Sequence, residues 1–300
     1  MADRRLQVFH AVAKHLSFTK AADALFMTQP AVTFQIKQLE EQYSTRLFER
    51  RHGGISLTPS GELVLGYAER ILALSEELET RLLEMTGEMR GPLLVGASTT
   101  IAEFMLPRIL GEFNALYPQV RARLVVANSE SIESRVAEHT LDVGLIEAPA
   151  KLPGLACQIC CDDELQVICA PDYPLAKLQS VQPKALVDYE YISREPGSGT
   201  REVIDAYFRA NQVPVESLKL QMELGSPEAL KGVVSTGLGF AIVSRAVVAK
   251  ETQLGALAAI PLNPPLTRSL YLVHPQDRFR SRLAGTFIEF AKHKLQELVL

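Results

Sequence analysis

The sequence predicts an α/β protein in three parts: a small head over residues 1–59, a long helix over residues 60–90 and a two-lobed body over residues 91–300. Three observations lead to this prediction. Two short helical patterns and a glycine-tipped hairpin pattern follow one another in the head. A proline-free stretch follows, in which an apolar residue recurs at every seventh position. Strand and helix patterns then alternate, which is typical of an α/β domain.

The head begins with a helical stripe of apolar side chains over residues 4–15. Thr19 is the predicted N-cap of a second short helix. A third helix is expected after Thr28, because Pro30 then falls in its first turn, where the missing N–H group is harmless. Residues 46–58 predict a hairpin whose turn is a Gly-Gly pair.

The third helix and the hairpin carry the groups by which proteins recognise DNA. Free N–H groups at a helix N-terminus bind phosphate, and hydroxyl and amide side chains can hydrogen-bond base edges. Basic side chains supply charge for the backbone. The predicted DNA-contacting residues are Thr28, Gln29, Pro30, Ala31, Thr33, Gln35, Lys37, Arg46, Arg50 and Arg51. The alternative is a small helical cap with ordinary surface charges.

The charge of the chain is distributed unevenly. The net charge is −4, but residues 1–60 hold eight Lys or Arg and five Asp or Glu, a net +3, so the remainder carries −7. A mildly basic head on an acidic body suits a DNA-binding protein that acts in more than one copy. No signal-peptide pattern and no membrane-spanning stretch are recognised, so we expect a cytoplasmic protein without a membrane partner.

The long helix shows a seven-residue repeat, which predicts a two-stranded coiled coil of about four heptads. The repeat positions are Val64, Ile71, Leu78 and Met85, with Ala68, Ser75 and Leu82 between them. A rod of this length is about 45 Å long and cannot bury its own apolar side. We therefore expect a homodimer, with a helix that packs on its own body as the alternative.

The body is predicted to have largely parallel sheets, with Gly91-Pro92 as its boundary. The expected strands are Leu93–Gly96, Ala122–Ala127, Val143–Glu147, Leu165–Cys169, Tyr191–Ser193, Gln221–Leu224, Phe240–Val243 and Leu270–Val273, and the expected helices cover residues 101–116, 130–139, 200–211, 227–236 and 281–297. Asp162-Asp163 and Asn263-Pro264-Pro265 are the predicted crossings between two lobes. Lobe I would comprise residues 91–162 and 267–300, and lobe II residues 163–266.

Each lobe contains one segment that resembles an anion site, because hydroxyl residues and a helix N-terminus follow a strand. Glycines in the second segment allow a close approach of the backbone, and its arginine can pair with a carboxylate or phosphate. The predicted effector-binding residues are Ser98, Thr99, Thr100, Glu195, Ser198, Gly199, Thr200, Arg201 and Ser226. Each segment alone could be an ordinary helix cap, but the pair predicts a small anionic metabolite held between the lobes.

Four cysteines, Cys157, Cys160, Cys161 and Cys169, lie close together in the sequence. Their segment has an extended pattern, in which side chains three apart face opposite ways, so reduced structural cysteines are favoured over a redox sensor or a zinc site. No metal site and no cofactor are expected. Neither Ser98 nor Ser198 stands in the Gly-x-Ser-x-Gly pattern of a hydrolase nucleophile, and no phosphate-loop motif occurs, so no catalytic residue is predicted.

The head resembles the winged helix-turn-helix of the LysR-type transcriptional regulators. The matching motif is Ser17-Phe18-Thr19-Lys20-Ala21-Ala22, followed by Gln29-Pro30-Ala31-Val32-Thr33, Gln35-Ile36, Leu39-Glu40 and Leu47-Phe48-Glu49-Arg50. Ser44 departs from the pattern, because the family usually has glycine there. The long helix and the two-lobed body follow in the family's order, and the pair of anion segments resembles the branch of Calvin-cycle and sulfur-assimilation regulators.

The resemblance implies an effector-binding domain like the periplasmic binding proteins and a homodimer or homotetramer on double-stranded promoter DNA. A small anionic effector between the lobes would change DNA binding, and RNA polymerase is an expected partner. Two other hypotheses remain open. The body could act as a cytoplasmic solute-binding protein or small-molecule enzyme with a vestigial head, or it could serve oligomerisation alone.

Overall fold

The computed structural model describes residues 3–51, 54–85, 89–276 and 280–299. Within these ranges, some side chains are not described: those of Arg50, Arg51, Ala73, Glu76, Glu77, Glu79, Thr80, Arg81, Leu83, Glu84, Met85, Leu298 and Val299. The chain forms two compact units, Met1–Glu88 and Met89–Leu300. Each unit is described by itself.

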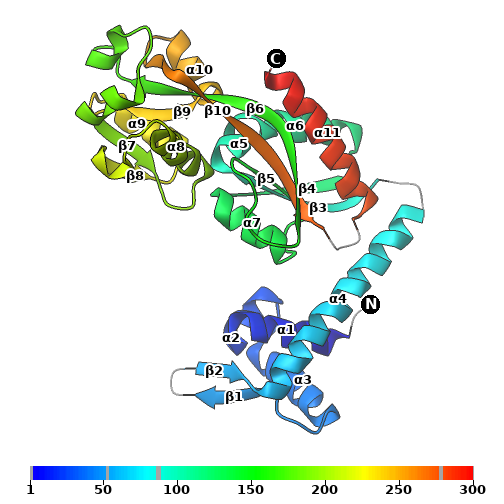
Figure 1. Cartoon of the computed structure of the whole chain (residues 1–300). Coiled ribbons are helices and arrows are strands. Elements are labelled where there is room, and N and C mark those ends of the chain that lie inside the picture. Colours follow the sequence, from blue (N-terminus) through cyan, green and yellow to red (C-terminus); the bar gives the residue numbers. More distant parts are fainter. Residues whose placement is uncertain (1–2, 52–53, 86–88, 277–279, 300) are drawn as a thin grey trace. The chain divides into compact units, whose positions relative to one another are not determined.

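The first unit is a helical head with a two-stranded hairpin (Figure 1). Its helices are α1 (Arg4–His15), α2 (Phe18–Ala24) and α3 (Gln29–Gln42). Ser17 and not Thr19 caps α2, because the Ser17 hydroxyl accepts a hydrogen bond from the Lys20 N–H group. Thr28 stands at the N-cap of α3 as predicted, but its side chain makes no cap hydrogen bond.

The predicted hairpin is present as β1 (Phe48–Arg51) and β2 (Gly54–Leu57), paired antiparallel. The first turn glycine, Gly53, lies outside the described residues. Glu40 near the end of α3 fixes the start of the hairpin, since its Oε1 accepts hydrogen bonds from the N–H groups of Leu47 (2.7 Å) and Phe48 (3.3 Å). Helix α3 and the hairpin, which corresponds to the wing of the predicted winged helix-turn-helix, are therefore joined by one carboxylate.

Ser44 adopts a left-handed backbone with φ of 51° between α3 and β1. This conformation is unfavourable for residues with a Cβ atom and readily adopted by glycine. The geometry explains why glycine is usual in the family at this position, and it shows that the serine is accommodated without loss of the wing.

Helix α4 (Pro59–Met85) follows the hairpin, as the sequence predicted, but the first two positions of the predicted heptad seam, Val64 and Ala68, do not face outwards. Ala68 is fully buried and Val64 partly buried against the core of the head, so these two positions are not available to a second helix. Another row of side chains is exposed at spacings of three or four residues, on one side of the helix: Leu63, Tyr67, Ile71, Leu74, Leu78 and Leu82. The predicted heptad seam was therefore wrong at its start. Met85 lies outside the described side chains.

The second unit is built around a six-stranded sheet in the order β4-β3-β5-β10-β6-β9. Its strands are β3 (Gly91–Ser98), β4 (Val120–Ala127), β5 (Val143–Ile146), β6 (Leu155–Cys169), β9 (Ala241–Ser244) and β10 (Ala258–Pro275). Strand β3 pairs parallel with β4 and β5, whereas the β5–β10, β10–β6 and β6–β9 pairs are antiparallel. The prediction of largely parallel sheets was wrong for this reason.

Strands β6 and β10 are much longer than the predicted segments and run through both lobes (Figure 1). Asp162 pairs with Ser269, and Asp163 pairs with Arg268. The second crossing between lobes therefore lies at Arg268–Ser269 and not at the predicted residues 263–265, which fall in a register irregularity of β10.

Lobe I has helices on both faces of its part of the sheet. One face carries α5 (Thr99–Phe104), α6 (Leu106–Leu116) and α11 (Arg282–Val299), and the other carries α7 (Ser129–Ala137). The predicted single helix over residues 101–116 is broken at Met105, which separates α5 from α6. The short α5 thereby ends at the lobe boundary, where its Phe104 ring lies 5.0 Å from the ammonium of Lys231 in lobe II.

Lobe II adds a small parallel sheet of β7 (Glu190–Arg194) and β8 (Lys219–Leu224). Helices α8 (Gly199–Ala210) and α9 (Pro227–Val234) pack against this small sheet, whereas α10 (Arg245–Gln253) packs against β6, β9 and β10. Short 3₁₀ helices lie at Pro174–Lys177, Pro183–Asp188 and Val215–Ser217. Throughout the described ranges of both units, none of the helices combines the length and the apolar character that a bilayer crossing requires.

Candidate functional site

The head exposes most of the residues predicted to contact DNA. Those exposed on its surface are Thr28, Gln29, Pro30, Thr33, Lys37 and Arg46, whereas Ala31 and Gln35 are half-buried. The side chains of Arg50 and Arg51 lie outside the described side chains, although their backbone forms the end of β1. The hydroxyl of Thr33 donates to the carbonyl of Gln29 (3.0 Å).

The outer face of α3 also holds a residue that the sequence analysis did not choose. Val32, Ile36 and Leu39 turn into the core, and the opposite side exposes Phe34. At 3.6 residues per turn, Gln35 points roughly 150° away from the direction shared by Pro30 and Lys37. The assignment of Gln35 to base recognition stays a prediction.

In the body, a buried carboxylate accepts hydrogen bonds from hydroxyl groups that were predicted to bind the effector. Glu147 accepts hydrogen bonds from Ser98 Oγ (2.8 Å), from Thr200 Oγ1 and from Arg268 Nη1 (2.9 Å). Its side chain and that of Arg268 are each 1% exposed. The hydroxyls of both lobes thus converge, as predicted, but on an internal anion.

The charge state of Glu147 follows from these contacts. Burial alone would raise the pKa of the carboxyl group, but the Arg268 guanidinium and the hydroxyls of Thr200, Thr100 and Ser98 outweigh it and lower the pKa to about 2. Glu147 is therefore ionised at neutral pH, and it resists a second anion in the same place.

Arg268 extends this network to the crossing strands. Its Nε donates to Asp163 Oδ2 (2.9 Å), and Asp163 Oδ1 accepts from the hydroxyl of Ser244 (2.7 Å). Arg268 and Asp163 are register partners on β10 and β6. A single guanidinium thus joins a strand end of lobe I to the crossing point of the two lobes.

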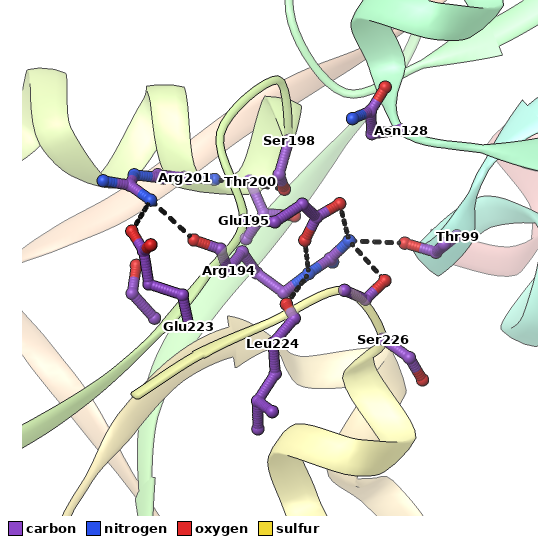
Figure 2. Close-up of polar contacts among 12 residues, drawn as sticks. Thr99, Asn128, Arg194, Glu195, Ser198, Thr200, Arg201, Glu223, Leu224 and Ser226 are labelled. Atoms are coloured by element: carbon purple, nitrogen blue, oxygen red, sulfur yellow. Dashed lines mark hydrogen bonds and ion pairs between the residues drawn. The ribbon is translucent and has the colours of Figure 1, made fainter. Parts of the chain in front are cut away.

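A second buried arginine, Arg194, lies at the boundary between the lobes and is 3% exposed (Figure 2). Its Nη2 donates to Thr99 Oγ1 in lobe I (2.9 Å), and its Nε donates to the Leu224 carbonyl in lobe II (3.2 Å). The neighbouring Glu195 supplies both carboxylate oxygens, at 2.8 Å and 3.1 Å. Glu195 is 25% exposed, so this counter-ion is partly open to solvent.

The other predicted effector residues lie near Arg194, and their polar groups already contact other groups of the protein. Arg201 pairs with Glu223 and donates to the Arg194 carbonyl, and Figure 2 shows its guanidinium directed away from that of Arg194. Ser198 and Ser226 accept from backbone N–H groups at the starts of α8 and α9. Gly199 has no room for a side chain, since a Cβ atom there would lie 2.6 Å from Ser129 Oγ.

A pocket of about 490 Å³ lies between α7 and α8. Ser198 and Arg201 line it, together with the carboxylates Glu130, Glu133, Glu202 and Asp205 and the cations Lys151 and Arg209. Arg194 does not line it, so the buried cation and the pocket are separate features of the lobe boundary.

The cysteines lie on β6 and its end. Cys157 is exposed and Cys160 buried, as expected for opposite faces of a strand. Burial raises the pKa of Cys160 to about 11 and that of Cys161 to about 12, so both remain protonated thiols at neutral pH. The described residues contain no group of three or more histidine, cysteine or acidic side chains placed to hold a metal ion.

Both units match models of known protein families. Residues 4–62 match the bacterial regulatory helix-turn-helix protein, lysR family, and residues 86–296 match the LysR substrate binding domain. The chain belongs to the LysR family of transcriptional regulators. As a LysR-type regulator it binds DNA through the head and carries an effector-binding domain, and it is not an enzyme.

Two curated relatives are similar to this protein along almost its whole length. A probable RuBisCO transcriptional regulator of Cyanidioschyzon merolae is 37% identical over 289 residues, which cover 95% of both chains. A probable RuBisCO transcriptional regulator of Synechocystis is 35% identical and aligns over 95% of this chain and 84% of its own. The resemblance to Calvin-cycle regulators is confirmed at this level.

Two solved structures are also similar. The regulatory domain of Synechocystis CcmR, in complex with 2-PG, is 30% identical with a TM-score of 0.63, and the match covers 68% of this chain and 97% of that domain. Full-length CbnR in complex with its target DNA is 21% identical with a TM-score of 0.66, covering 98% of this chain and all of that one. At that identity, CbnR supports the fold alone.

The LysR-type effector domain contains polar residues that the sequence analysis missed: Glu147, Asp163, Arg194 and Arg268. One signal was available for two of them, Glu147 and Arg194, because a charged residue within or directly after an apolar strand pattern must be paired when it is buried. Their partners were not accessible from the sequence, since Glu147 and Arg268 are 121 positions apart.

Proposed function

We propose that this LysR-type regulator responds to a small anion, of the phosphorylated carboxylate class, that binds Arg194 between the lobes and alters promoter binding. Arg194 is the observation that supports the proposal most directly. It is almost fully buried and bridges Thr99 of lobe I and Leu224 of lobe II, and its charge is balanced by a partly exposed carboxylate.

Glu195 is the group that the effector would replace. An arginine presents its N–H donors in a fork that fits carboxylate and phosphate equally well. The exposed edge of the Glu195 carboxylate can move into water when an effector anion takes its place. Because Arg194 contacts both lobes, the exchange would change how firmly the lobes are held together.

Two other locations are less suited to an anion. The hydroxyl groups of Ser98 and Thr200 already hold the ionised Glu147. The pocket between α7 and α8 has four carboxylates against three cations, and its Arg201 is paired with Glu223. Bringing a second negative charge to either place is opposed by like-charge repulsion.

Similar proteins support the chemical class. The CcmR regulatory domain is in complex with 2-PG, which is 2-phosphoglycolate, and the curated relatives are probable RuBisCO regulators. 2-Phosphoglycolate carries both a phosphate and a carboxylate. We propose it as the first ligand to test on this chain.

We further propose that the protein acts as a homodimer or homotetramer on dyad-symmetric promoter DNA. The exposed row of Leu63, Tyr67, Leu74 and Leu78 on α4 is an apolar side that a second copy of the helix would cover. A head with a net charge of +3 gains affinity when two copies bind one duplex.

The test is calorimetric titration of the full-length protein with 2-phosphoglycolate. We expect binding in the wild type and loss of binding in Arg194→Ala. Arg108→Ala, which removes an exposed arginine paired with Glu112, should bind as the wild type does. Glu195→Gln should bind about tenfold more tightly, because the competing charge is gone, and a tenfold change corresponds to about 1.4 kcal/mol. Weaker binding in Glu195→Gln would contradict the exchange.

A further inference from the structure

Phe34 is an exposed aromatic side chain on the outer face of α3. It is 57% exposed, whereas the apolar residues Val32, Ile36 and Leu39 of the same helix are at most 3% exposed in the head core. Phe34 is absent from the hydrophobic cluster that holds Phe9, Phe18 and Phe48. Packing of the head therefore gives no reason for a phenylalanine at this position.

The surroundings of Phe34 point towards a nucleic acid partner. Pro30 lies one turn before it and Lys37 one turn after it, and both are exposed on the same side of α3. Thr33 flanks this row with an exposed side chain. The row thus combines an apolar centre with a cation and a hydroxyl residue, on the helix that follows the tight turn of a DNA-binding head.

The major groove offers such a side chain one kind of apolar group. Among the base edges, only thymine presents a methyl group there, and aromatic and aliphatic side chains recognise it by contact. A phenyl ring lacks hydrogen-bond donors and acceptors in its plane, so it gains nothing from the polar edges of guanine, adenine or cytosine.

We infer that Phe34 is a specificity-determining residue that packs against thymine methyl groups in the operator half-site. The inference rests on α3 being the helix that enters the major groove. It adds an apolar contact to the hydrogen-bonding residues proposed for the same helix. It also predicts that half-sites contain thymine at a fixed position opposite the middle of α3.

Deoxyuridine tests this inference, since it differs from thymidine only by the missing methyl group. A duplex is first selected from randomised DNA with the wild-type protein, and each thymine is then replaced by deoxyuridine. Burial of one methyl group contributes about 0.8 kcal/mol, which is about fourfold in affinity. We expect the wild type to lose about fourfold at one thymine of each half-site.

Phe34→Ala should bind the thymine duplex more weakly and lose the distinction between thymine and deoxyuridine at that position. Phe34→Leu, which keeps an apolar side chain, should retain it. Phe26→Ala is the matched control, because it removes an even more exposed phenylalanine (97%) from the turn before α3. An unchanged melting temperature is expected for all three variants, since both side chains lie outside the core.

The outcomes separate this inference from DNA binding itself. Failure to select any duplex would contradict DNA recognition by the head. A selected duplex for which Phe34→Ala keeps the wild-type ratio between thymine and deoxyuridine at every position would overturn the role of Phe34. Loss of the ratio in Phe26→Ala as well would show that the effect does not belong to α3.

Discussion

Glu147 and Arg268, 121 positions apart in the sequence, form an ion pair in which Oε2 and Nη1 lie 2.9 Å apart and both side chains are 1% exposed. The carboxylate also binds hydroxyls from lobe I and lobe II, and the guanidinium reaches Asp163 on the crossing strand. An internal carboxylate thus binds the hydroxyl groups of the two segments that were predicted to bind a ligand. For this reason we propose Arg194, and not these hydroxyl groups, as the partner of the effector charge.

Removal of the charge of Glu147 should destabilise the body strongly. Glu147→Gln keeps the size of the side chain but leaves Arg268 with Asp163 as its remaining anion. Loss of one partner of a buried pair costs about 3 kcal/mol, which a urea titration monitored by circular dichroism would measure. Glu202→Gln removes one side of the exposed Lys151 pair and should change stability by less than about 1 kcal/mol. Equal effects of the two substitutions would contradict the buried network.

The same carboxylate predicts an acid dependence of stability. The pKa of Glu147 is about 2 in the folded protein against an ordinary value of 4.5. Because the folded pKa is depressed, its contribution is fully present above pH 4.5 and is lost as the pH falls towards 2. The shift corresponds to roughly 3 kcal/mol. Urea titrations between pH 5 and pH 2.5 should show a smaller slope of stability with pH in Glu147→Gln than in the wild type.

Ser44→Gly should stabilise the head. The left-handed backbone at φ of 51° is unfavourable for serine and favourable for glycine. Since glycine also gains entropy in the unfolded chain, we expect a net gain of only about 0.5–1 kcal/mol. Thermal unfolding of the first unit would measure it. Destabilisation would show that the serine side chain makes a compensating contact.

The extent to which the sequence predicted this structure depends on how local each feature is. The helix starts near Pro30 and the wing hairpin depend on neighbouring residues, and the structure confirms them. The N-cap is Ser17 in place of the predicted Thr19, a hydroxyl residue only two positions away. The break at Met105 is followed by Pro107 in the first turn of α6, a helix-start signal that the prediction of one helix over residues 101–116 overlooked.

The pairing of strands that lie far apart in the chain could not be predicted from the sequence. The lengths of β6 and β10 follow from their pairing with each other, since extended segments with charged residues such as Asp163 and Arg268 are stable only when those charges meet. The hydroxyl segments were located correctly by their helix starts. The carboxylate that binds these hydroxyl groups was not predicted, because Glu147 follows β5 and lies 53 positions from Thr200 in the sequence.

Leu78→Glu should weaken self-association through α4. The side chain is 54% exposed in a row of leucines, and a charge in a helix-helix seam is strongly unfavourable. Analytical ultracentrifugation should show a loss of dimer. Leu254→Glu, at an 82% exposed position at the end of α10, should leave the mass of the assembly unchanged. If Leu78→Glu still forms the dimer, α4 does not form the interface.

If an anion on Arg194 controls promoter binding, the effect of the anion on DNA affinity must depend on the Arg194 guanidinium. The affinity of the full-length protein for its selected duplex is measured by fluorescence anisotropy, with and without saturating 2-phosphoglycolate, in the wild type and in Arg194→Lys. The variant keeps the charge but lacks the planar fork that bridges Thr99 and Leu224. We expect 2-phosphoglycolate to change the DNA affinity of the wild type by about fivefold or more, a size usual for coupled sites. In the variant we expect no change, at the same DNA affinity without effector. An identical response in both proteins would contradict this expectation.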